Sequence, residues 1–165
     1  MGMAGGIMAA WFVTRDAFWM MGGALSGIIS VASGIDLWYP GTAFAVGAVG
    51  GLLMPYCHKM LTSWGIDDAV GAVSVHGFVG IWGVMSVGIL LGGYPAPSAD
   101  IPEISFIGQL VGAISFFLLG FVPGYVLSWI LNKAGLLRYS DAILKMGVDR
   151  TEGTTAAYPD FQKSA

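Results

Sequence analysis

Residues 67–83 read DDAVGAVSVHGFVGIWG, and this stretch decides the fold class. Two carboxylates are followed by a long apolar run, and the next carboxylate in the chain is Asp100. About 20 apolar residues span the hydrocarbon core of a bilayer. The stretch therefore predicts a membrane-spanning helix that carries one ionisable side chain, His76, near its middle.

The composition of the whole chain places it in the same class. Of its 165 residues, 56% are hydrophobic and only 10% are charged, and the mean hydropathy is +0.75. An average soluble domain carries about 25% charged residues. The chain is therefore predicted to be an all-α integral membrane protein, with a length that suits one domain.

Several kinds of function find no support in the sequence. The net charge of −3 comes with no basic patch, so we expect no nucleic-acid partner. A single cysteine, Cys57, excludes an internal disulfide and a cysteine metal cluster. No nucleophile–base pair, phosphate-binding loop or metal-ligand spacing stands out. We therefore expect neither an enzyme nor a metal or other cofactor.

Five apolar segments organise the chain, and a polar tail follows them. We expect four full transmembrane helices and, at the N-terminus, a short helix that represents the end of a longer one. Residues 1–138 are predicted to form the transmembrane bundle, and residues 139–165 a tail that folds only against something else. The segments lie at about 1–13, 17–37, 41–61, 69–91 and 104–131.

Glycines with GxxxG spacing recur along these segments. Small residues let helix backbones approach closely in lipid, where no hydrophobic force draws helices together. One such pair means little in a membrane protein, but six predict a compact bundle. The pairs are Gly2/Gly6, Gly23/Gly27, Gly47/Gly51, Gly88/Gly92, Gly108/Gly112 and Gly120/Gly124.

The basic residues predict the orientation in the membrane. With five segments, all seven Lys and Arg residues fall on one side, and the opposite loops, 35–40 and 92–103, have none. Positive charge marks the cytoplasmic side. The C-terminus is therefore expected on the cytoplasmic side of a bacterial inner membrane, or on the matrix side of an organelle inner membrane. The basic residues are Arg15, Lys59, Lys133, Arg138, Lys145, Arg150 and Lys163.

His76 has two interpretations. α-Helical spacing places it on one face with Val73, Gly80 and Gly83, where glycine leaves space around the ring. A buried ionisable group in a membrane helix marks a functional site by default, and a neutral imidazole suits a polar small molecule or a proton relay. The alternative is a histidine that bonds a neighbouring helix for packing alone. The other histidine, His58, lies at a helix end with a poor route to the same site.

Asp67 and Asp68 are interpreted as N-terminal caps of the His76 helix. Carboxylates at this position accept backbone N–H groups and interact favourably with the helix dipole. Capping is a simpler explanation than catalysis, because no partner for catalysis is evident.

Three stretches of the chain resemble one family. The segment DDAVGAVSVHGFVGIWG resembles the signature of the ammonium transporter (Amt/Mep) family, in which a DD start leads to VHG-x-x-G-x-x-G. Upstream, GGALSGIISVASGIDLWYPGTAFAVGAVGG is similar to that family's NGALAGLVAITAG…SPWAAIIIGAIAG. The tail element MGVDRTEGTTAAY is similar to EGLD…HGESAY. Order and spacing agree over about residues 17–158.

The resemblance implies a fold and a role for His76. Family members have eleven transmembrane helices, in two inverted five-helix repeats plus a last helix, and form trimers. The chain matches the end of the seventh helix through the eleventh. By this resemblance, His76 is the second histidine of the pore pair, near which ammonium sheds its proton, and Gly77, Gly80 and Gly83 are helix-packing and pore-lining glycines.

Two departures from the family pattern bear on function. Gly71 stands where the family often has Asp, and Gly22 where it has Asn or Ser. Both changes remove polar groups near the site, and the first histidine belongs to the family's first half. We therefore expect an accessory or structural subunit of a membrane complex that does not conduct ammonium alone. The alternative is the C-terminal half of a split ammonium transporter, completed by a chain with the first half.

The expected partners follow from these two interpretations. They are lipid, other integral membrane subunits, a chain that supplies the first half, or further copies of the chain, as in family trimers.

Overall fold

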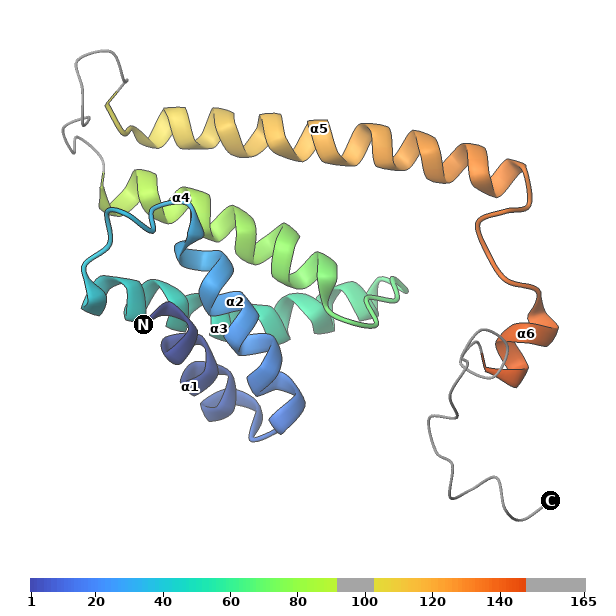
Figure 1. Cartoon of the computed structure of the whole chain (residues 1–165), viewed down its shortest axis with the longest axis horizontal. Helices are drawn as coiled ribbons and strands as arrows, with labels where there is room; N and C mark the ends of the chain where they lie inside the picture. The colour runs from blue at the N-terminus through green and yellow to red at the C-terminus, as the bar shows by residue number, and fades with distance from the viewer. Residues whose placement is uncertain (92–102, 148–165) are drawn as a thin grey trace. The chain divides into compact units, whose positions relative to one another are not determined.

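A computed structural model of the chain describes residues 1–91 and 103–147, and the regular secondary structure within them is entirely helical. This confirms the predicted all-α membrane fold class. Three helices are long and apolar enough to cross a membrane: α3, the continuous η1–α4 helix, and α5. Two more, α1 and α2, are apolar but shorter. The helices are α1 (Gly2–Thr14), α2 (Ala17–Ala32), α3 (Pro40–Ser63), the π-helix η1 (Val73–Val79), α4 (Gly80–Leu90), α5 (Phe106–Lys133) and α6 (Asp141–Met146) (Figure 1).

Helix α2 ends at Ala32, five residues before the end of the predicted segment 17–37. The Gly34 carbonyl accepts the backbone N–H groups of Leu37 and Trp38, at 2.9 and 3.1 Å. The Trp38 indole N–H donates to the Val31 carbonyl at 3.1 Å. The Val31 carbonyl, near the helix end, also accepts the Gly34 N–H at 3.2 Å. A turn therefore replaces the last residues of the predicted segment, which include the charged Asp36.

Glycines bring α1, α2 and α3 into backbone contact. A β-carbon built on Gly6 would collide with the Gly23 carbonyl, and one on Gly47 with the Gly2 carbonyl. A β-carbon on Gly51 would likewise meet the backbone of Gly6. Three of the six GxxxG pairs, in α1, α2 and α3, therefore lie where helices touch without side chains between them.

The η1–α4 helix packs on α2 and α3. Val75 and Val79 of η1 form a buried cluster with Met54 of α3. The Trp82 indole N–H donates to the Val46 carbonyl at 3.0 Å, and the Ser33 hydroxyl donates to the Gly83 carbonyl at 2.9 Å. Apolar packing and two side-chain hydrogen bonds thus fix this helix against its neighbours.

The chain divides into two compact units, Met1–Leu118 and Leu119–Ala165, and α5 passes from the first into the second. No residue of α5 is buried within the described structure. A β-carbon built on Gly112, Gly120 or Gly124 would meet no atom within 4 Å. In the predicted tail, α6 is a single short helix whose N-cap Ser140 accepts the Ile143 N–H, and residues 148–165 lie outside the described part.

Candidate functional site at the start of the His76 helix

The turn before η1 depends on a glycine. Gly71 has a φ of +72°, a conformation that residues with a β-carbon rarely adopt. Its N–H donates to the Asp68 carbonyl at 2.8 Å, and its carbonyl accepts the Val75 N–H at 2.8 Å. The chain reverses here and starts the helix within four residues. Gly71 therefore has a structural role in this turn.

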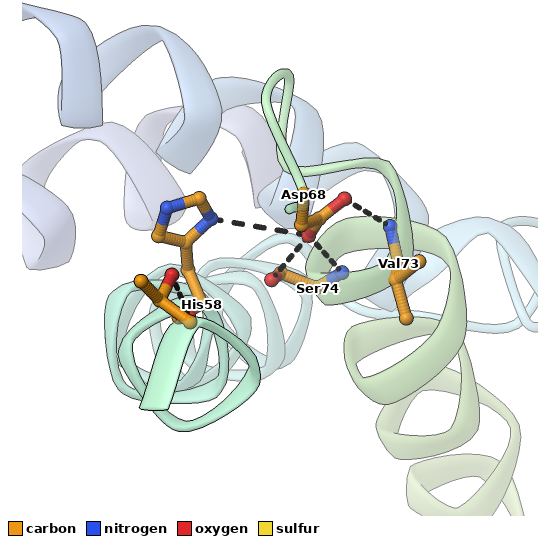
Figure 2. Close-up of polar contacts among 5 residues, drawn as sticks. His58, Asp68, Val73 and Ser74 are labelled. Atoms are coloured by element: carbon orange, nitrogen blue, oxygen red, sulfur yellow. Dashed lines mark hydrogen bonds and ion pairs between the residues drawn. The ribbon is translucent and has the colours of Figure 1, made fainter. Parts of the chain in front are cut away.

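Asp68 receives the first backbone donors of the helix. Its Oδ1 accepts the Val73 N–H at 2.9 Å, and its Oδ2 accepts the Ser74 N–H at 3.0 Å and the Ser74 hydroxyl at 2.7 Å (Figure 2). Burial by itself raises the pKa of this carboxyl, but the three hydrogen bonds and the nearby His58 outweigh burial and hold the pKa below its usual range. Asp67 is exposed, and the described structure gives it no such bond.

His58 approaches the same carboxylate from the end of α3. Its Nδ1 lies 3.9 Å from Asp68 Oδ2, and its ring packs edge to face on Trp19 of α2, with centroids 5.1 Å apart. Sequence reasoning set His58 aside because it considered only a route to His76. The available signal was different: a histidine at one helix end and a carboxylate at the next helix start are joined by a short connection.

His76 lies in η1, on the side away from the packed core. Its side chain is exposed, whereas Ser74, Val75 and Val79 are buried. The expected burial of His76 is therefore not provided by the residues that the structure describes, because α2 and α3 cover the other side of the helix. π-Helical turns are rare and occur often at functional sites.

The three glycines near His76 do not share one environment. A β-carbon on Gly83 would lie 2.9 Å from the carbonyl oxygens of both Ile29 and Ser30, so Gly83 is a packing glycine against α2. A β-carbon on Gly77 would meet only Val73 of the same helix, at 3.6 Å, and one on Gly80 would meet Ile29 at 3.9 Å. α-Helical spacing placed His76 and Gly83 on one face. The structure separates them, because the π-helix has wider turns.

The chemistry open to this site is limited and specific. An imidazole in its neutral form presents one N–H donor and one acceptor. No group of three His, Cys, Asp or Glu side chains within the described residues is arranged to hold a metal ion. The exposed ring of His76 can therefore bind or relay a proton to a small polar molecule, provided that other residues enclose it.

Comparison with known proteins connects this geometry to a family. The Ammonium Transporter Family matches residues 1–158 of the chain. The ammonium transporter Amt2 of Methanocaldococcus jannaschii is 34% identical over 97% of the chain, which spans 38% of that relative. Amt2 of Archaeoglobus fulgidus is 33% identical over 84% of the chain, which spans 32% of it. A putative ammonium transporter of Synechocystis, sll0537, is 32% identical over 87% of the chain, which spans 27% of it. The chain belongs to the ammonium transporter family.

Proposed function

We propose that this chain forms one wall of an ammonium-conducting pore in a membrane and that His76 is its pore histidine. The observation that carries the proposal is the position of His76. Its ring is exposed on a π-helix whose opposite side is fixed to α2 and α3. The relatives' names supply the substrate, ammonium.

A second wall is part of this proposal. Transporter sites in many inverted-repeat folds lie between the two repeats, so one repeat leaves its site open on one side. In the described residues, the His76 ring is open in this way. The completing helices come either from further residues of the same polypeptide or from another chain.

The ring suits the physical problem that ammonium poses. A charged group at the centre of a bilayer is costly, whereas a neutral polar molecule of the same size costs far less. An imidazole acceptor that receives a proton from the bound ammonium lets neutral ammonia continue through an apolar passage. The imidazolium then passes that proton to water, and the ring can accept another. The role is transport and not catalysis. The seven basic residues favour a C-terminus on the cytoplasmic or matrix side.

Growth of cells that lack ammonium transporters tests the proposal. We expect the 165-residue chain alone not to restore growth on limiting ammonium, and co-expression with the N-terminal half of a relative such as Amt2 of Methanocaldococcus jannaschii to restore it. The matched control is that N-terminal half alone. Rescue by the chain alone, or failure of the two halves to rescue although they co-purify, would contradict the proposal.

A second candidate function, an accessory subunit of a membrane complex, rests on Met54. The Met54 methyl group lies 2.7 Å from a β-carbon built on Gly22 and 2.8 Å from one built on Gly71. Met54 is only 1% exposed. Gly22 and Gly71, where the family pattern has polar side chains, thus lie on either side of the buried Met54 thioether. This apolar contact favours a packing role over ammonium transport.

Purification under native conditions distinguishes the two functions. An accessory subunit is expected to co-purify with unrelated integral membrane proteins, and His76→Ala is expected to leave that complex intact. A pore wall is expected to co-purify with family-related helices that supply the second wall.

A further inference from the structure

An unused ring nitrogen lies beside the carboxylate that starts the His76 helix. Nδ1 of His58 is buried and has no hydrogen-bond partner among the described residues. It faces Asp68 Oδ2 at 3.9 Å, about 1 Å beyond the usual hydrogen-bond distance. Figure 2 shows the ring turned so that this nitrogen points at the carboxylate and the other nitrogen points away.

The protonation state of this nitrogen decides whether the contact attracts or repels. Without a hydrogen on Nδ1, a lone pair faces a carboxylate oxygen, and two acceptors repel. With a hydrogen on Nδ1, the ring donates to the carboxylate, and the donation is strongest when both nitrogens are protonated and the ring is cationic. Closing the remaining gap needs only a small shift of the imidazole.

We propose that His58 is a proton-sensitive positioning residue, whose Nδ1–H closes on Asp68 Oδ2 when the ring is protonated and so clasps the end of α3 to the first turn of η1. The clasp acts on a carboxylate that already holds the backbone N–H groups of Val73 and Ser74. The clasp also fixes the helical turn that carries His76, three residues after Val73. That this matters for transport rests on the proposed function, whereas the clasp itself does not.

The other charged side chains around His58 have contacts or positions that do not involve its Nδ1. On its own helix, Lys59 lines a pocket that His58 and Trp19 also line. From the corner between α1 and α2, Arg15 lies over the Trp11 and Phe12 rings, and Asp16 accepts the Phe18 N–H at 2.8 Å. Asp67 is exposed. Asp68 is therefore the carboxylate that the His58 ring faces.

The direction of the pH effect follows. Histidine changes charge between about pH 5 and 8, whereas Asp68, with its lowered pKa, stays ionised over that range. Acidification therefore creates the cation while the anion persists, and the clasp strengthens as the pH falls toward about 5.5.

Hydrogen exchange of the Val73 and Ser74 amides measures the clasp without measuring transport. The full chain in lipid nanodiscs is compared at about pH 5.5 and about pH 7.5, with correction for the intrinsic exchange rate. We expect exchange in peptides that cover residues 67–76 to be about fivefold slower at the lower pH, because a charged hydrogen bond is stronger than a neutral one. The same difference is expected in His76→Ala, which leaves His58 as the sole histidine.

Two variants at His58 separate the clasp from packing. His58→Phe keeps a ring against Trp19 but has no donor, so the pH dependence should disappear. His58→Asn carries an amide donor near the Nδ1 position, so residues 67–76 should be protected equally at both pH values. No pH dependence in the wild-type chain, or an unchanged pH dependence in His58→Phe, would overturn the proposal. If His58→Phe does not fold, a pH dependence retained by His58→Asn overturns it.

Discussion

The two sides of the η1–α4 helix differ sharply. One side carries Val75, Val79 and Gly83, which pack on α2 and α3 with almost no exposed surface. The other side carries Val73, which is 47% exposed, and the His76 ring. The comparison shows how a membrane helix can present an ionisable group: close packing on one side fixes the helix, and the other side leaves the ring exposed.

Substitution of the glycines on the two sides should give the largest contrast. We expect Gly83→Ala to destabilise the fold by about 1–3 kcal/mol, because the new methyl group meets the backbone carbonyls of Ile29 and Ser30, which cannot rotate away. Gly77→Ala, the matched control, should stay within about 0.5 kcal/mol. Unfolding in detergent mixtures measures both. Equal effects would show that the two sides do not differ in packing.

Removing the charge of Asp68 should have the next largest effect. Asp68→Asn keeps an acceptor but loses the charge-assisted bonds to Val73 and Ser74, so we expect a loss of about 1–2 kcal/mol. Asp67→Asn, at an exposed position, should change stability by less than about 0.5 kcal/mol. A larger effect at Asp67 than at Asp68 would refute the capping assignment.

Asp68 also predicts how stability depends on pH. Its pKa is lowered in the folded chain, so its contribution is complete above the unfolded value of about 3.9 and is lost as the pH falls through the lower folded value. The wild-type chain should therefore lose more stability below about pH 4 than Asp68→Asn does. Parallel acid titrations of the two proteins would count against this account.

His76 itself should contribute least to stability. Its side chain is exposed on the free side of the helix, so His76→Ala should change the free energy of unfolding by less than about 0.5 kcal/mol. A loss of about 1–2 kcal/mol would instead indicate a packing bond to a neighbouring helix. The same unfolding assay gives the answer, with Val73→Ala as the comparison on the same side.

Parts of this picture follow directly from the sequence, and others do not. The long apolar run after two carboxylates predicts the η1–α4 helix, and GxxxG spacing predicts the backbone contacts of Gly6, Gly47 and Gly51. Apolar composition alone cannot mark where α2 ends, because the turn depends on hydrogen bonds to Gly34 and Val31.

The site shows the same division. Sequence patterns single out His76, but they assume α-helical turns, and the π-helix changes which residues share its face. The contact between His58 and Asp68 depends on the conformation of the connection between α3 and η1. The hydrophobic periodicity of the sequence does not predict the conformation of such a connection. The convergence of Gly22 and Gly71 on Met54 is likewise tertiary, since the three residues come from three separate segments.

The most direct test of the central claim is ammonium flux through an assembly that contains this chain and the helices that complete its pore. Proteoliposomes with the wild-type chain are compared with His76→Ala, with Val73→Ala as the matched control on the same helix side. The account predicts that His76→Ala lowers the flux at least about tenfold, as expected for loss of a proton-relay group, while the assembly stays intact and the control keeps its flux. An intact His76→Ala assembly with unchanged flux would contradict the assignment of His76 as the pore histidine.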